Sequence, residues 1–312
     1  MVERVIRCPL GLLDSTEKIQ MPVKNLFLSV GAMKAGTTFL YNTLSRHPQI
    51  FCTPEKELHY FAHTQEFSRK LQKPLMPSGI GFPTIQKGSI LTHNLRRSRL
   101  SAVMHNRYSK LTDAEEVRNI VRWYADRYLV DPIDPNWFDS VYEGAGDNWC
   151  AEFSNYNAQL NDKSWANIRT HCENLRVLYV LRDPVKRLWS HIKFEMLLSG
   201  KRDALVSSNI DIARKFLASG SSSHARYTEV VNSLKRNLSE SELLVLRLED
   251  VVENPVSELR RITEFMGIAE IDVSGVNTRR KANSTEDLPL PAEFRELFET
   301  AVRPEIEFFN KF

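Results

Sequence analysis

The 312-residue sequence contains little cysteine, no long apolar run and no large excess of charge of either sign. Its four cysteines have neither the spacing of metal ligands nor the density of a disulfide framework, so we expect reduced thiols and a cytoplasmic protein. No stretch approaches the roughly 20 apolar residues that span a bilayer, and residues 1–20 lack the apolar core of a signal peptide. The formal net charge of +3 is too small to indicate nucleic-acid binding.

Acidic residues are missing from one long stretch. Between Phe67 and Thr112 there is no Asp or Glu, whereas nine basic residues occur there: Arg69, Lys70, Lys73, Lys87, Arg96, Arg97, Arg99, Arg107 and Lys110. The remainder of the chain is therefore net acidic. A basic block attracts anions, so an anionic acceptor and a peripheral membrane surface are two candidate partners. A solvated surface segment without a specific partner is the third interpretation.

Continuous apolar runs, rather than alternating ones, predict strands that are buried on both faces. These runs are Leu26–Val30, Trp149–Phe153, Val177–Leu181 and Leu243–Leu248. Helical periodicity predicts helices over Thr38–Arg46, Pro184–Leu198, Ala225–Leu234, Val256–Met266 and Pro291–Phe309. Strands that alternate with helices predict an α/β fold, with a P-loop-like central parallel β-sheet flanked by helices. We expect a single domain over 1–312, with about 62–145 forming an insertion on its core.

A phosphate-binding loop is predicted where the first strand meets the first helix. The sequence there is Gly31-Ala-Met-Lys34-Ala-Gly36-Thr37-Thr38. The two glycines permit a tight backbone, and the helix N-terminus and threonine hydroxyls supply donors to an anion. Nucleotide kinases place a lysine directly after the second glycine of this loop, where this chain has Thr37. The loop is therefore not of the kinase type.

A second anion-binding motif follows the third predicted strand. It reads Arg182-Asp-Pro-Val-Lys-Arg-Leu-Trp-Ser190. An arginine at the carboxyl end of a parallel strand faces the crevice where α/β sheets bind ligands, and Ser190 follows about two helical turns later. A guanidinium fork and a hydroxyl are suitable ligands for a phosphate monoester. For Asp183, a local helix-capping role is the alternative.

Together, the two motifs resemble the nucleotide-binding signatures of sulfotransferases that use 3′-phosphoadenosine 5′-phosphosulfate (PAPS). The first is similar to the family's 5′-phosphosulfate loop. The second is similar to its 3′-phosphate signature R-D-P-x-x-R-x-x-S-x-[YW], with Ile192 in place of the final aromatic residue. The resemblance covers about residues 24–62 and 147–312. It implies a cofactor site without a metal ion, formed by Lys34, Ala35, Gly36, Thr37, Thr38, Arg182 and Ser190.

The segment Lys56-Glu57-Leu58-His59-Tyr60-Phe61 resembles the K-E-x-x-[FY]-F stretch of the carbohydrate, heparan-sulfate-type branch. An attacking hydroxyl loses its proton, and a carboxylate beside the phosphate site can accept it. The resemblance implies Glu57 as this base, whereas His59 is the rival because the small-molecule branch uses a histidine. A surface salt bridge of Glu57 with Lys56 or with a basic residue of the insertion is the purely structural interpretation.

The resemblance implies in-line transfer of a sulfuryl group from PAPS to a hydroxyl or amine of a carbohydrate or glycolipid. Lys34 would neutralise charge on the leaving group as adenosine 3′,5′-bisphosphate departs. No cysteine follows Cys172, so the late disulfide of the secreted enzymes is absent and the likeness is to bacterial or cytosolic members. Looser similarity places Tyr227 near the nucleotide, with core packing as the alternative, and an unassigned basic residue of 279–281 over the nucleotide. The rival functions are a P-loop small-molecule kinase with Asp183 as a Mg²⁺ ligand, and a nucleotide-binding adaptor without catalysis.

Overall fold

Five parallel strands lie at the centre of the protein in the order β2-β3-β1-β4-β5. The computed structural model describes residues 23–77, 81, 83–105, 113–206, 209–273 and 288–312. The strands are β1 (Asn25–Ser29), β2 (Ile50–Cys52), β3 (Trp149–Glu152), β4 (Asn174–Leu181) and β5 (Leu243–Arg247). The predicted α/β fold with a parallel sheet is confirmed.

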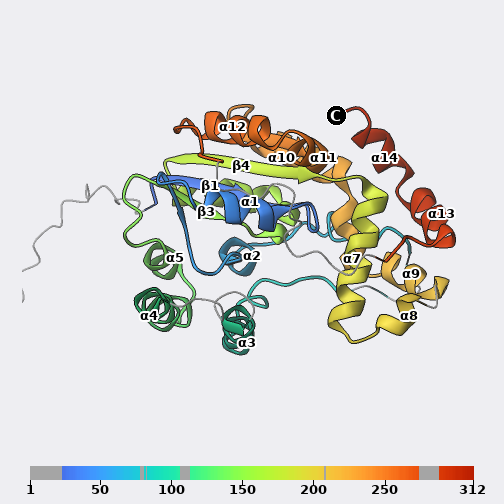
Figure 1. Cartoon of the computed structure of the whole chain (residues 1–312), viewed down its shortest axis with the longest axis horizontal. Helices are drawn as coiled ribbons and strands as arrows, with labels where there is room; N and C mark the ends of the chain where they lie inside the picture. The colour runs from blue at the N-terminus through green and yellow to red at the C-terminus, as the bar shows by residue number, and fades with distance from the viewer. Residues whose placement is uncertain (1–22, 78–80, 82, 106–112, 207–208, 274–287) are drawn as a thin grey trace, which may run out of the picture.

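Helices surround this sheet and fill most of the remaining described chain (Figure 1). Those that precede β3 are α1 (Thr37–Leu44), α2 (Tyr60–Thr64), α3 (His93–Val103), α4 (Ala114–Trp123), the π-helical turn η2 (Tyr124–Tyr128) and α5 (Pro135–Val141). Between β3 and β5 lie η3 (Asn155–Gln159), α6 (Asp162–Ile168), η4 (Arg169–His171), α7 (Pro184–Leu198), α8 (Arg202–Val206), α9 (Ile210–Leu217), η5 (Gly220–Ala225) and α10 (Tyr227–Asn237). The last helices are α11 (Leu248–Glu253), α12 (Pro255–Met266), α13 (Ala292–Ala301) and α14 (Arg303–Phe309).

The arrangement in space separates three groups of helices (Figure 1). In this view α10, α11 and α12 gather on the side of the sheet where β4 lies, and α2 to α5 gather on the opposite side. Helix α7 extends away from the end of β4 toward α8 and α9. No helix within the described ranges is both long and apolar enough to cross a membrane.

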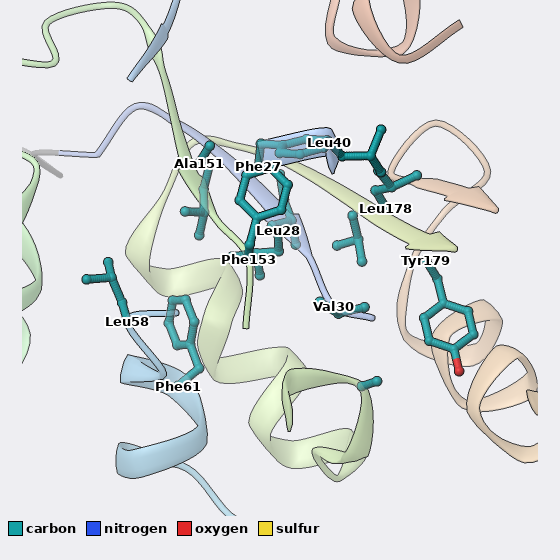
Figure 2. Close-up of a cluster of buried hydrophobic side chains, with 14 of the residues drawn as sticks. Phe27, Leu28, Val30, Leu40, Leu58, Phe61, Ala151, Phe153, Leu178 and Tyr179 are labelled. Atoms are coloured by element: carbon teal, nitrogen blue, oxygen red, sulfur yellow. The ribbon is translucent and has the colours of Figure 1, made fainter. Parts of the chain in front are cut away.

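The core forms around the adjacent strands β1 and β4, because their side chains are apolar on both faces. Figure 2 shows Phe27 of β1 beside Phe153, whose ring centroids are 6.1 Å apart in an edge-to-face arrangement. Leu40 of α1 and Leu178 of β4 extend the same cluster. Burying a large apolar side chain of this kind stabilises a fold by about 1.5–3 kcal/mol. The sheet is therefore a rigid support for the loops that leave its carboxyl edge.

Local signals give helix α7 the boundaries predicted for it. Pro184 occupies the first helical turn, where its missing N–H costs no hydrogen bond. Asp183 precedes it, and its Oδ1 accepts a hydrogen bond from the backbone N–H of Lys186 at 2.8 Å. An N-cap of this kind contributes about 1 kcal/mol. The interpretation of Asp183 as a helix cap is confirmed.

One predicted helix is divided in the structure, and one short strand was not predicted. The helix predicted over Pro291–Phe309 is two helices, because the chain turns at Val302 with φ −118° and ψ 21°. Pro304 lies in the first turn of α14, and its ring and missing N–H prevent α13 from continuing through this point. The three-residue strand β2 was not predicted, since so short a run has no detectable periodicity.

The segment over 62–145 contributes to the core as well as to the surface. Tyr128, Trp137 and Phe138 belong to the main hydrophobic cluster. Arg96 is fully buried and donates hydrogen bonds to the carbonyl oxygens of Leu91, Tyr128 and Val130 and to Asp131. The interpretation of the basic stretch as a solvated surface is therefore wrong for Arg96, whose buried side chain connects several backbone segments. Arg97 and Lys87 are exposed.

Candidate functional site

The phosphate loop connects β1 to α1 and has the backbone shape that its glycines predict. Gly31, Lys34 and Gly36 have φ angles of 128°, 69° and 80°. Gly36 is the N-cap of α1, and a Cβ atom there would lie 2.5 Å from Cδ1 of Leu248. The left-handed backbone favours glycine at this position, and a larger residue would also have to displace the end of the Leu248 side chain. The N-terminus of α1 directs its first N–H groups out of the loop, as an anion site needs.

The second motif meets this loop directly. Strands β1 and β4 are neighbours, and Nη1 of Arg182 donates a hydrogen bond of 2.8 Å to the carbonyl oxygen of Lys34. Nζ of Lys34 lies 3.9 Å from the centroid of the Phe194 ring on α7. Burial, and then the nearby charge of Arg182, lower the pKa of Lys34 to about 8. Ser190 is half-buried on the second turn of the same helix.

A second arginine of this motif is buried behind the loop. Arg187 is fully buried, and its Nε and Nη2 atoms have no hydrogen-bond partner among the described residues. Its Nη1 atom lies 3.4 Å from Nδ1 of His191. A buried guanidinium without a counter-anion is costly. Arg182, Lys34 and Arg187 thus concentrate positive charge at one end of the sheet, which favours a polyanionic ligand there.

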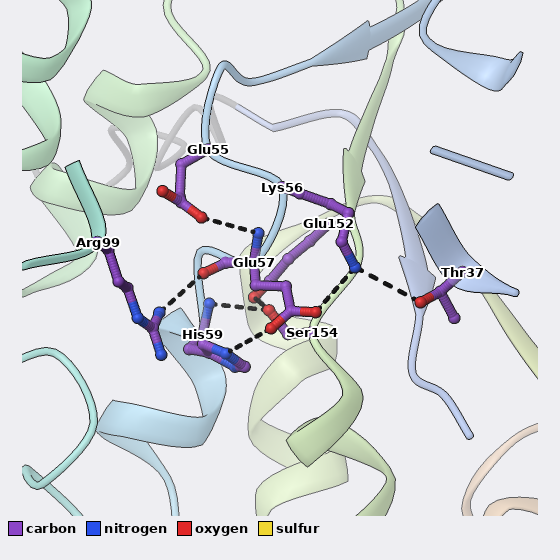
Figure 3. Close-up of polar contacts among 8 residues, drawn as sticks. All are labelled: Thr37, Glu55, Lys56, Glu57, His59, Arg99, Glu152 and Ser154. Carbon is purple, nitrogen blue, oxygen red and sulfur yellow. Dashed lines mark hydrogen bonds and ion pairs between the residues drawn. The ribbon is translucent and has the colours of Figure 1, made fainter. Parts of the chain in front are cut away.

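The loop between β2 and α2 brings the two candidate bases beside the phosphate loop (Figure 3). Nζ of Lys56 lies 2.8 Å from Oε1 of Glu57 and donates a longer hydrogen bond, 3.4 Å, to Oγ1 of Thr37. Nε2 of His59 lies 3.3 Å from Oε2 of Glu57. Figure 3 shows these side chains converging on the carboxylate of Glu57. Glu57, His59 and Thr37, singled out separately in the sequence, are therefore brought together.

Exposure distinguishes the two candidate bases. The Glu57 side chain is 31% exposed, whereas the His59 side chain is 1% exposed. Burial alone would raise the pKa of Glu57, but Lys56 and His59 together lower it, so the carboxylate is ionised. Burial lowers the pKa of His59, so its ring is neutral, and the hydrogen bond to Glu57 places its proton on Nε2. The geometry favours Glu57 as the group that an acceptor can reach, with His59 holding it in place.

A buried hydrogen-bond chain fixes the backbone at His59. The His59 backbone N–H donates to Oγ of Ser154 at 2.8 Å, and that hydroxyl donates to Oε1 of Glu152 at 2.5 Å. Glu152 is completely buried, and burial raises its pKa to about 7. His59 itself has a left-handed φ of 56°, which is uncommon outside glycine. These hydrogen bonds therefore hold in place a backbone conformation that the loop would not adopt on its own.

The segment over 62–145 supports the same loop from outside. Nη1 of Arg99 donates to the carbonyl oxygen of Glu57 at 3.2 Å. The buried carboxylate of Glu55 accepts hydrogen bonds from the Glu57 N–H at 3.5 Å and from the Tyr124 hydroxyl at 3.2 Å. The salt bridge of Glu57 that we considered as a structural role exists with Lys56, and Arg99 of the insertion contacts the Glu57 backbone.

The sequence model of the sulfotransferase family matches residues 27–272. The chain belongs to the sulfotransferase family. Its fold is similar to a sulfotransferase from Alicyclobacillus acidocaldarius, with 18% identity over 92% of this chain and 95% of that one and a TM-score of 0.49. It is also similar to the sulfotransferase domain of the Synechococcus PCC 7002 olefin synthase (18% identity, 89% and 95% coverage, TM-score 0.47). The sulfotransferase domain of the curacin biosynthetic pathway is comparable (15% identity, 90% and 98% coverage, TM-score 0.47). No curated protein sequence matches this chain.

Membership of this family supports an enzyme that transfers sulfuryl groups. In this sulfotransferase, Tyr227 is fully buried and its hydroxyl donates to the carbonyl oxygen of Arg182 at 2.9 Å. Ala35 is also fully buried. Residues 279–281, expected to close over the cofactor, lie outside the described residues. Within the described ranges, no three His, Cys, Asp or Glu side chains form a group that could hold a metal ion.

Two functional features of the sulfotransferase were not assigned from the sequence. The support of His59 by Glu152 and Ser154 was not predicted, although a carboxylate inside an otherwise buried strand is a signal for a specific partner. The contact of Arg99 with the loop between β2 and α2 depends on how the insertion packs. No local pattern in the sequence encodes that packing.

Proposed function

We propose that this sulfotransferase transfers a sulfuryl group from PAPS to a hydroxyl or amine of a carbohydrate or glycolipid acceptor. The observation that carries the proposal is the hydrogen bond between Arg182 and the carbonyl oxygen of Lys34. It joins two motifs that are 148 positions apart in the chain into one cationic site. Two facts fit a nucleotide that carries several phosphate charges: Nε and Nη2 of Arg187 have no partner in the described part of the chain, and Gly36 is left-handed.

In this proposal each motif binds one end of the nucleotide. Thr37, Thr38 and the loop N–H groups would hold the 5′-phosphosulfate, and Arg182 and Ser190 would hold the 3′-phosphate. PAPS, when bound, supplies an activated sulfuryl group, so the protein needs to position groups and balance charge rather than provide a covalent nucleophile. Lys34 remains largely protonated at neutral pH with a pKa of about 8 and can offset negative charge on the leaving oxygen.

Glu57 accepts the acceptor's proton in this mechanism. Lys56 and His59 each contact one of its carboxylate oxygens, and each oxygen keeps a lone pair for a further hydrogen bond. These two contacts orient the carboxylate toward the phosphate loop. The Lys56–Glu57 pair also supports assignment to the carbohydrate branch, because that branch carries the same residues. His59 is a positioning residue rather than the base.

The proposal is tested by calorimetric titration with adenosine 3′,5′-bisphosphate, AMP and Mg-ATP. We expect micromolar binding that requires the 3′-phosphate and that weakens at least tenfold in Arg182→Ala and in Ser190→Ala. Exposed Glu264 on α12 provides a matched control, since Glu264→Gln should change nothing. Preference for Mg-ATP would support the kinase instead. Tight binding of PAPS without turnover on any acceptor would support the adaptor.

A further inference from the structure

A cavity of about 520 Å³ opens beside the phosphate loop. Met33 of the loop forms part of its wall, and the other walls come from the insertion, from η3, from α7 and from η5. This volume is in the range of small-molecule sites, about 300–1,000 Å³. It fits one or two sugar rings with an attached group rather than a long polysaccharide chain.

Aromatic contacts join this cavity to the proposed base. The ring centroid of Tyr156, which lines the cavity, lies 5.2 Å from that of His59 and 5.6 Å from that of His224. Arg99 lines the cavity as well and contacts the backbone of Glu57. A molecule in the cavity therefore lies against the residues that hold the base.

The lining of the cavity is chemically mixed. The phosphate loop and the insertion contribute its aliphatic side chains, Met33, Ile85, Ile90 and Leu95, and the insertion also contributes Gln72, Thr84, Ser89 and Arg99. A wall of polar side chains comes from α7, η3 and η5: His191, Glu195, His224, Gln159, Ser221 and Ser223. An amphipathic molecule matches such a lining, because its apolar part is stabilised by the aliphatic side chains and its hydroxyl groups by the polar wall.

The polar wall carries one ionised carboxylate. Nε2 of His191 lies 3.2 Å from Oε1 of Glu195, and burial lowers the pKa of His191 to about 4. Burial also lowers the pKa of His224 well below its usual range. Both rings are thus neutral at pH 7. Burial opposes ionisation of Glu195, but hydrogen bonds from His191 and Ser221 lower its pKa. Two cations lie near this wall. Nη1 of Arg187 is 3.4 Å from Nδ1 of His191, and Arg99 donates a hydrogen bond to the carbonyl oxygen of Glu57.

We infer that this cavity binds an uncharged amphipathic acceptor, an alkyl or acyl glycoside, with Glu195 accepting a hydrogen bond from one of its hydroxyls. The aliphatic part packs on Ile85, Ile90 and Leu95. A carboxylate in this wall attracts hydroxyl or ammonium donors and repels a carboxylate or sulfate on the acceptor. The inference rests on the proposed function and narrows its acceptor class. It favours an uncharged acceptor over the anionic one that the basic stretch suggested.

The test is calorimetric titration of the protein saturated with adenosine 3′,5′-bisphosphate. The ligands are n-octyl β-D-glucopyranoside, methyl β-D-glucopyranoside and n-octyl β-D-glucuronide, which differ in the alkyl chain and in charge. We expect the octyl glucoside to bind at least tenfold more tightly than either of the others. Glu195→Gln should reduce the discrimination against the glucuronide about tenfold and leave the affinity for the bisphosphate unchanged. Leu95→Ser, at a side chain that is 46% exposed, should reduce the octyl-over-methyl preference about threefold.

Several results would overturn the inference. Equal or tighter binding of the glucuronide by the unmodified protein would refute the uncharged acceptor. Unchanged discrimination in Glu195→Gln, with Glu264→Gln as the matched control, would refute the role of Glu195. If the bisphosphate binds and the octyl glucoside does not bind at millimolar concentration, the acceptor class is wrong while the cofactor proposal stands. Failure of the bisphosphate itself to bind would instead overturn the proposed function.

Discussion

Glu152 offers a direct test of how burial controls the loop that carries the candidate base. The change Glu152→Gln keeps the shape of the side chain and removes its charge. The folded protein holds the Glu152 proton up to about pH 7, whereas the unfolded chain releases it near pH 4.5. The contribution of Glu152 to stability is therefore greatest below pH 4.5 and is lost as the pH rises toward 7.

The size of this effect follows from the two pKa values. Their difference corresponds to about 3 kcal/mol of stability that Glu152 costs the protein between low pH and pH 8. A side chain without a titratable group, such as glutamine, has no such loss. Oε2 of Glu152 has no hydrogen-bond partner among the described residues, so the amide nitrogen of glutamine adds little cost beyond that of the protonated acid. We therefore expect Glu152→Gln to match the unmodified protein within about 1 kcal/mol at pH 5. At pH 8 it should be more stable by about 2–3 kcal/mol.

The assay is urea denaturation of both proteins between pH 5 and pH 8, with Glu264→Gln as an exposed control. The free energy of unfolding should decline with pH in the unmodified protein and in the control, and this part of the decline should vanish in Glu152→Gln. Parallel profiles for all three proteins would refute the reasoning, because they would show that folding does not raise the pKa of Glu152. Equal slopes m in urea would confirm that only stability has changed.

Three further predictions concern the loops of the site. Gly36→Ala forces a non-glycine residue to φ 80°, so urea denaturation should show a loss of about 1–2 kcal/mol. The added Cβ would lie 2.5 Å from the movable end of the Leu248 side chain, so a Leu248→Ala background should recover only the smaller part of that loss, and full recovery would contradict the backbone argument. Lys34→Ala should reduce kcat at least about 100-fold in a radiolabelled PAPS assay, and turnover near that of the unmodified enzyme with intact PAPS binding would remove Lys34 from the mechanism. Lys56→Met removes a cation that lowers the pKa of Glu57, so the acidic limb of the kcat/KM profile should move to higher pH, and an unmoved limb would argue against Glu57 as the base.

The sequence predicted those parts of the site that depend on local signals. Gly36 and Pro184 have backbone requirements that can be recognised without the fold, and both mark element boundaries in the structure. Arg182 was placed correctly at the end of a strand, because strand and helix patterns meet there. The assignments of these residues to a cofactor stay predictions until binding is measured.

The remaining features depend on packing between segments that are distant in the chain. The burial of Arg96 requires carbonyl oxygens of residues 128 and 130, which its own helix does not contain. His191 and His224 come from α7 and η5, and only the fold places their rings 6.1 Å apart. Periodicity and turn signals report the neighbours along one element. They carry no information about which side chains meet across a cavity.

The position of β1 between β3 and β4 has a consequence for synthesis of the protein. β1 ends at Ser29, but its two partners begin only at Trp149 and Asn174. A ribosome that adds roughly 5–20 residues per second makes the nascent strand wait on the order of 10 s for either neighbour. During that interval an apolar strand has two unpaired edges, a condition that favours aggregation. A nascent chain also lacks Arg182 until β4 has left the ribosome, so the two motifs of the candidate site can meet only after that point.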